Sequence, residues 1–232
     1  MSGAPDPGRI ARWGLAAALG AGLLLSGPVV ARQWTIARYE AWARRDLGDA
    51  APPPWLPRPG RTCDAACPPS ALVASAVSLG AQAGGLATPA LRKAAYHAAD
   101  QQLSAALAAQ PASGDGWTWL AYMRLREGRS MADVRQALAR SYDAAPFLIK
   151  EGPWRARIAA ADWPLLATRT RAQVVEEAVW LRDVDPAAFG DVVPAFSDPD
   201  AVQALAQALR RPPSAIVPHR WGGAPGGVGS SQ

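Results

Sequence analysis

Residues 99–146, ADQQLSAALAAQPASGDGWTWLAYMRLREGRSMADVRQALARSYDAAP, decide the expected fold. Two segments of this stretch space their small and apolar residues alike before a proline, in steps of four, three and five residues. The two prolines are 35 residues apart, close to the roughly 34-residue period of helix-turn-helix repeats. The stretch therefore predicts one helix-turn-helix unit with half of another before it. The matching residues are Ala99, Leu103, Ala106, Pro111, Val134, Leu138, Ser141 and Pro146.

The composition of the chain favours an all-α fold class. Alanine is abundant and β-branched residues are sparse, and alanine is the best helix former. With 232 residues, half of them hydrophobic, one or at most two domains are expected. The net charge of +5 is carried almost wholly by arginine. Because no dense basic run contains interleaved aromatic residues, we expect no nucleic-acid partner.

The N-terminal region contains an uncharged apolar stretch over residues 13–31. Its length suits a transmembrane helix, and Trp13 and Trp34 lie near its two ends, where amphipathic rings favour the membrane interface. We therefore expect a short N-terminal tail over 1–12 and a single membrane anchor. A cleaved signal peptide is the alternative, because the stretch ends on the small residue Ala31.

Two further segments precede the main domain. Residues 32–47 predict a juxtamembrane helix, and residues 48–69 are rich in proline. Prolines at this density favour extended polyproline segments, so we expect a semi-rigid linker that holds the domain off the membrane. Cys63 and Cys67 lie in this linker. A disulfide in an oxidising compartment and two unpaired thiols in a loop both fit their spacing.

Residues 70–211 predict an antiparallel helical domain, followed by a disordered tail over 212–232 rich in proline and glycine. Helix starts are expected at Thr88-Pro89, Asp115, Ser130 and Asp198-Pro199, and Gly128 is expected to end a helix. The buried contact between the two central helices is expected to be made by Trp117, Leu120 and Leu138.

The central stretch resembles a tetratricopeptide repeat. Trp117, Leu120 and Ala121 match the first helix of the repeat motif, whereas Arg124 stands where the motif has tyrosine. The resemblance implies a scaffold without catalytic activity that binds a protein partner along one helix face. The residues expected on that face are Thr118, Trp119, Tyr122 and Arg126.

Residues 137–177 also resemble accessory proteins of VpsP type, which accompany bacterial exopolysaccharide biosynthesis genes. The residues that carry the resemblance are Ala137-Leu138, Ser141, Pro146, Arg157, Ala161-Asp162-Trp163-Pro164-Leu165, and Arg171 to Glu177. This resemblance implies an anchored adaptor whose partner belongs to the envelope polysaccharide machinery.

The resemblance places the protein in a bacterial inner membrane, with one span. Arginines are more numerous after the apolar stretch than before it, which favours a cytoplasmic domain. A short basic N-terminus before an apolar run is the form of an export signal, and the cysteine pair suits an exported chain. We therefore expect the domain on the periplasmic side.

No pattern of catalytic residues is recognised. His97 and His219 are the only histidines and lie far apart in sequence, and the adjacent Glu176 and Glu177 point in different directions on a helix. We expect no catalytic residues, no cofactor and no metal, and expect the arginines near Glu177 to pair with it in solvent. Two alternatives remain: an envelope glycan enzyme whose site the sequence hides, and a structural spacer of a secretion complex.

Overall fold

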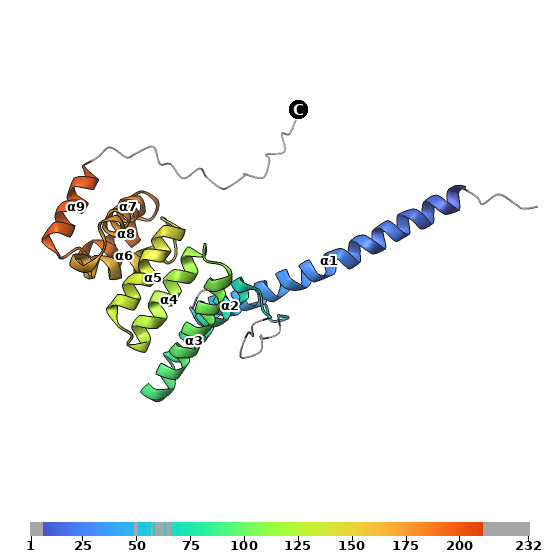
Figure 1. Ribbon diagram of the computed structural model, residues 1–232, viewed down its shortest axis with the longest axis horizontal. Coiled ribbons are helices and arrows are strands. Elements are labelled where there is room, and N and C mark those ends of the chain that lie inside the picture. The colour runs from blue at the N-terminus through green and yellow to red at the C-terminus, as the bar shows by residue number, and fades with distance from the viewer. Residues whose placement is uncertain (1–6, 49–50, 57, 59–62, 64–65, 211–232) are drawn as a thin grey trace, which may run out of the picture. The chain divides into compact units, whose positions relative to one another are not determined.

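The computed structural model describes residues 7–48, 51–56, 58, 63 and 66–210, and the side chains of its first helix from Ser26 onward. These residues form α-helices and two short 3-10 helices, and no strand occurs among them (Figure 1). The expected all-α fold class is confirmed. The expected tail over 212–232 lies outside the described residues. The chain divides into two compact units, residues 1–151 and 152–232.

The first unit is built from antiparallel helices that follow α1. Its helices are α1 (Pro7–Asp46), α2 (Pro69–Ala83), α3 (Pro89–Ala109), α4 (Gly114–Glu127) and α5 (Met131–Ala144). Helix α2 packs against α3, α3 against α4, and α4 against α5, and α2 also contacts α4 (Figure 1). Arg126 near the end of α4 reaches Tyr96 early in α3, and Arg124 reaches Asp100. These pairs show that α3 and α4 run in opposite directions.

Most of the predicted caps are present, because they depend on residues close in sequence. The side chains of Thr88 and Ser130 accept hydrogen bonds from the amides that open α3 and α5. Gly128 ends α4 with φ of 83°, the left-handed conformation that favours glycine. The cap of α4 is Ser113, whose side chain accepts from the Gly116 amide. The expected cap Asp115 instead accepts a hydrogen bond from the Ser113 hydroxyl.

The central helix pair has a buried core that only partly matches the expected one. Leu120 and Leu138 are each 1% exposed, as expected for residues between α4 and α5. Trp117 is only half-buried, and its indole N–H donates to the Pro111 carbonyl, 2.8 Å away. The expectation that Trp117 belongs to this core is therefore wrong.

The expected spacer over residues 48–69 is not what the described residues of that stretch form. Arg38 of α1 donates to the Arg58 carbonyl at 3.1 Å, and Trp55 stacks on Trp34 with ring centroids 5.8 Å apart. Leu56 is 7% exposed. The stretch folds along α1 because the apolar residues between its prolines gain burial, which an extended polyproline segment in solvent does not offer.

The second half of α1 and the start of the helical domain form one structure. The Asp46 side chain accepts hydrogen bonds from Ser78 and Gln82 of α2, while Thr35 and Pro69 line one shallow depression at the other end. The two helices therefore run in the same direction, and the proline-rich stretch is the return connection between them. The expected boundary at residue 70 is moved to the second half of α1.

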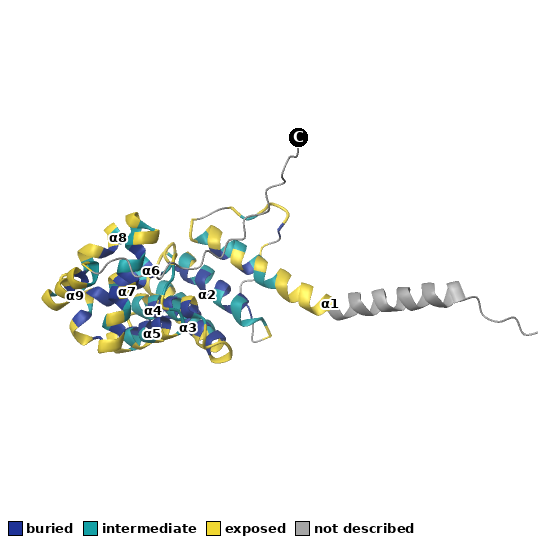
Figure 2. Cartoon of the chain, turned by 90° about the horizontal axis from the view of Figure 1, so that it is seen from above, coloured by how far each residue is buried: buried dark blue, intermediate teal, exposed yellow. Residues whose placement is uncertain are grey.

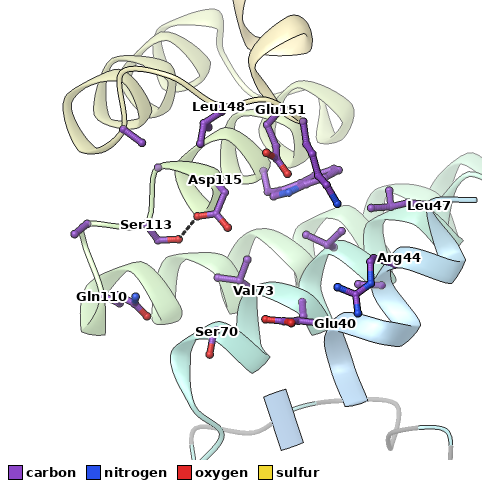
Figure 3. A pocket seen from close by; sticks show the side chains of 18 residues that line it. Glu40, Arg44, Leu47, Ser70, Val73, Gln110, Ser113, Asp115, Leu148 and Glu151 are labelled. Atoms are coloured by element: carbon purple, nitrogen blue, oxygen red, sulfur yellow. Dashed lines mark hydrogen bonds between the residues drawn. The ribbon is translucent and has the colours of Figure 1, made fainter. Parts of the chain in front are cut away.

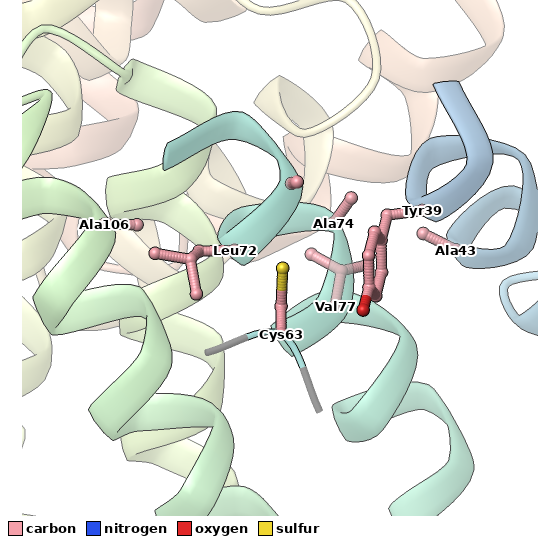
Figure 4. Close-up of a cluster of buried hydrophobic side chains, with 8 residues drawn as sticks. Tyr39, Ala43, Cys63, Leu72, Ala74, Val77 and Ala106 are labelled. Carbon is pink, nitrogen blue, oxygen red and sulfur yellow. The ribbon is translucent and has the colours of Figure 1, made fainter. Parts of the chain in front are cut away.

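A hydrophobic cluster joins α1 to α2. Tyr39 and Ala43 of α1 pack beside Leu72 and Val77 of α2, and Cys63 belongs to the same cluster and lies between Leu72 and Val77 in the view (Figure 4). Cys63 is 4% exposed and forms a disulfide with Cys67. The structure thus selects the disulfide over two free thiols. The bond fixes the return connection to the cluster.

The expected membrane anchor lies mostly outside the described side chains. Residues 13–25 are part of helix α1, but only their backbone is described and not their side chains. Residues 26–34 of α1 are exposed (Figure 2). In the portion of the chain with described side chains, no helix has both the length and the apolar character needed to cross a bilayer.

The second unit is smaller and encloses a buried ion pair. Its elements are α6 (Gly152–Ala161), a 3-10 helix (Trp163–Leu165), α7 (Thr168–Val184), α8 (Pro186–Val192), a 3-10 helix (Val193–Ala195) and α9 (Pro199–Leu209). Arg155 of α6 and Glu177 of α7 are both fully buried, with Arg155 Nη2 2.6 Å from Glu177 Oε1. The expected pairing of Glu177 with nearby arginines in solvent is therefore wrong, because its carboxylate faces α6.

Candidate functional site

Three of the four expected partner-binding residues lie on one face of α4. Trp119 and Tyr122 meet edge to face with ring centroids 5.8 Å apart, and the Arg126 guanidinium lies 5.9 Å from the Tyr122 ring. The spacing of three and four residues along the helix places them in one row. We call Trp119, Tyr122 and Arg126 the α4 face.

Tyr96 of α3 packs against Tyr122 and Arg126 of the α4 face. Its ring is 3% exposed and meets Tyr122 edge to face at 6.5 Å. Arg126 lies 5.6 Å from the Tyr96 ring, and its Nε donates weakly to the Tyr96 hydroxyl at 3.4 Å. A guanidinium over two aromatic rings is held by cation–π attraction. These contacts hold the Arg126 guanidinium in place, although Arg126 remains exposed to solvent.

The ionisation of this face is set by its own contacts. Burial raises the pKa of the Tyr122 hydroxyl, although the neighbouring Arg126 charge opposes that effect. The hydrogen bond to Tyr96 raises the pKa of Arg126. The tyrosine therefore stays neutral and the arginine stays charged near neutral pH. The α4 face presents two aromatic rings and one fixed positive charge.

A groove of about 560 Å³ lies in the same unit, and Trp119 belongs to both features. Its apolar side chains include Val73 and Val77 of α2. Charged side chains enter from α1, from the start of α4 and from the segment after α5 (Figure 3). These charged residues are Glu40, Arg44, Asp115, Lys150 and Glu151. A cavity of this size suits a small ligand or a few side chains of a peptide.

Glu151 is the groove residue whose ionisation is most affected. Burial raises the pKa of its carboxyl, and the nearby Asp115 charge raises it further. A backbone hydrogen bond, the Lys150 charge and a hydrogen bond from Trp119 act in the opposite direction, and the net pKa lies above the ordinary value of 4.5. Burial disfavours the charged form of the Glu151 carboxyl. A cation brought into the groove would stabilise that charged form.

Glu151 is expected to make folding stability fall as pH rises from about 4.5 through its raised native pKa. In that window the native protein holds a proton that the unfolded chain has released, so raising the pH favours unfolding. Glu151→Gln should remove this contribution. Urea unfolding of parent and variant over a pH series measures it, with the exposed Glu176→Gln as the control. A parent-minus-variant difference that does not change with pH would contradict the assignment.

Thr118, the fourth expected partner-binding residue, is not on the surface. It is 2% exposed, its hydroxyl donates to the Gly114 carbonyl at 3.1 Å, and it lies 2.7 Å from the Ser141 hydroxyl. One residue along a helix turns a side chain by about 100°, so Thr118 faces α5 while Trp119 is partly buried against the hydrophobic cluster of α1 and α2. The assignment of Thr118 to a binding face is corrected: it is part of the contact between α4 and α5.

Sequence reasoning missed the charged residues of the groove. Glu40 and Arg44 belong to α1, which was expected to be separated from the domain by the spacer. Asp115 lies in the first turn of α4, and Glu151 lies in the segment that follows α5. No local pattern brings these segments together. The small residues Gly114 and Ser141 were the one available signal of a close approach between α4 and α5, with Ser141 donating to the Gly114 carbonyl at 2.7 Å.

Comparison with known proteins adds no family assignment. No family profile matches the chain, and neither a curated protein nor a solved structure matches it significantly.

Proposed function

We propose that this protein is a membrane-anchored adaptor, without enzymatic activity, that binds a protein partner on the α4 face and in the adjoining groove. The observation that carries the proposal is the row of Trp119, Tyr122 and Arg126 beside an open cavity. Tryptophan, tyrosine and arginine are the residues most enriched at binding hot spots. In this proposal α2–α3 and α4–α5 form a tetratricopeptide-like array.

The chemistry of the site favours an extended peptide segment as the ligand. The apolar groove residues Val73 and Val77 suit an aliphatic or aromatic side chain. Arg126 is held by aromatic rings and exposed, which suits a carboxylate of the partner. A guanidinium commonly binds a carboxylate through two parallel hydrogen bonds.

The anchor and the biological setting are further parts of the proposal. The uncharged stretch 13–31 would hold the protein in a bacterial inner membrane as a single span. The resemblance of residues 137–177 to VpsP-type proteins supports exopolysaccharide biosynthesis or export as the setting. The partner would then be a component of the envelope polysaccharide machinery.

We also propose that the helical domain lies on the periplasmic side. The disulfide between Cys63 and Cys67 supports this orientation, because disulfides persist in oxidising compartments. The arginines after the span, which favour the opposite orientation, have structural contacts. Arg38 donates to a carbonyl of the return connection, and Arg45 and Arg58 lie over the Trp42 ring.

Alkaline phosphatase fused after Gln232 should be active in cells, because this enzyme folds only where its disulfides form. The same fusion to a chain shortened to begin after Ala31 is the control and should be inactive. A stable but inactive fusion of the full chain would place the domain in the cytoplasm.

Arg126→Ala is expected to weaken capture of the partner strongly while leaving the fold intact. Losing a hot-spot arginine typically costs about 2 kcal/mol of binding free energy, whereas an exposed side chain contributes little to stability. The measurement is affinity capture of the tagged full-length protein from its own membranes, with the captured proteins quantified.

Arg140→Ala is the matched control, because Arg140 is also exposed but lies on α5. It removes the same charge from a different surface and should leave capture unchanged. If Arg126→Ala and Arg140→Ala retain the same proteins in the same amounts as the parent, the α4 face is not the binding site.

A further inference from the structure

Two tryptophans form an exposed pair where α1 leaves the uncharged stretch. Trp34 is 45% exposed and Trp55 is 67% exposed, and their rings stack with centroids 5.8 Å apart and planes inclined by 20°. Trp34 follows Ala31, the last residue of the uncharged stretch, by three positions. Large aromatic surfaces kept outside a core usually mark an interaction site.

The position of Trp55 is fixed by its neighbours in the return connection. Leu56, the next residue, is buried. Arg38 of α1 donates to the Arg58 carbonyl at 3.1 Å, which ties the same segment to the helix. Trp55 is therefore held at the level of Trp34 although the two residues are 21 positions apart.

The helix that carries Trp34 packs against α2 of the domain. Beyond Trp34, the α1 residues Ile36, Tyr39 and Ala43 pack into the cluster shared with α2, and Cys63 fixes the return connection to that cluster (Figure 4). The second half of α1 is thus part of the same packed unit as α2. A span over 13–31 would bring the tryptophan pair to the membrane surface.

Arginines lie close in sequence to both tryptophans. Arg32 is exposed two positions before Trp34, and the exposed Arg58 lies with its guanidinium 5.4 Å from the Trp42 ring. Tryptophan at the level of the lipid headgroups, with arginine nearby in sequence, is common at the ends of membrane-spanning helices.

We propose that Trp34 and Trp55 insert together into the interfacial layer of the lipid bilayer, so that the helical domain rests on the membrane surface. The inference depends on the proposed anchor, because without it nothing brings the pair to a membrane. It assigns a function to the proline-rich connection, which presents Trp55 to lipid and joins α1 to α2.

The test uses the full chain reconstituted into vesicles of phosphatidylglycerol and phosphatidylcholine, with the phosphatidylcholine brominated on its acyl chains near the headgroup. Bromine quenches tryptophan fluorescence at short range. Trp55→Phe should remove about one third of the quenchable emission, since Trp13, Trp34 and Trp55 would be the interfacial tryptophans. Trp117→Phe, a half-buried tryptophan on α4, is the control and should not change it.

A further variant, Trp13→Phe, separates failure of this inference from failure of the anchor. If Trp13→Phe reduces quenching and Trp55→Phe does not, the chain is anchored but the connection does not touch lipid, and the inference is overturned. If neither substitution changes quenching, the anchor is absent and both proposals fall. A loss with both substitutions is the supporting result.

Discussion

Glu177→Ala should destabilise the second unit by about 3–5 kcal/mol, the usual cost of removing one partner of a buried ion pair. Arg155 and Glu177 are both fully buried, and Arg155 Nε lies 2.8 Å from Glu177 Oε2. A Cβ at Gly152 would come within 2.7 Å of Glu177 Oε1, so the carboxylate is enclosed by backbone as well. Without it, the guanidinium would lose its counter-charge in a site with no access to solvent.

Two comparisons separate this cost from a general effect of removing a glutamate. Glu176→Ala removes the same charge from an exposed neighbour on α7 and should change stability by less than about 0.5 kcal/mol. The paired replacement Arg155→Met with Glu177→Leu removes both charges and should recover much of the loss. Chemical denaturation of the full chain measures all three. If the paired variant is as unstable as Glu177→Ala, the loss comes from packing and not from the unpaired charge.

The buried pair illustrates what the sequence could and could not predict. The caps at Thr88 and Ser130 were predictable because each joins a side chain to an amide three residues away. Arg155 and Glu177 are 22 residues apart on different helices, and nothing in the local pattern distinguishes Glu177 from the exposed Glu176. Helix existence is a local property, whereas the partner of a charged residue depends on how helices pack.

The same distinction explains the return connection and the candidate site. Prolines restrict the local backbone, and from them an extended polyproline spacer was predicted over residues 48–69. They say nothing of burial, although Leu56 is buried and Cys63 packs into the cluster shared by α1 and α2. The α4 face was predictable because Trp119, Tyr122 and Arg126 follow one another at the three- and four-residue spacing of one helix face. The groove was not, because four separate segments line it.

Leu138→Ala is expected to cost about 2–5 kcal/mol of stability, whereas Trp117→Ala should cost only about 1 kcal/mol. Leu138 is 1% exposed within the contact between α4 and α5, so truncation leaves a cavity there. Trp117 is half-buried, and its one described hydrogen bond, to the Pro111 carbonyl at 2.8 Å, is at the exposed start of α4. The larger side chain should therefore matter less.

Urea unfolding of the two variants, followed by circular dichroism, tests this order. Leu138→Met is a useful companion, because it keeps the volume of the side chain and should cost less than about 1.5 kcal/mol. Equal losses for Trp117→Ala and Leu138→Ala would return Trp117 to the core that the repeat motif assigns to it. Thr118 would keep its contact with Ser141 in that case, because neighbouring residues of a helix can both be buried, as Leu120 and Ala121 of α4 are.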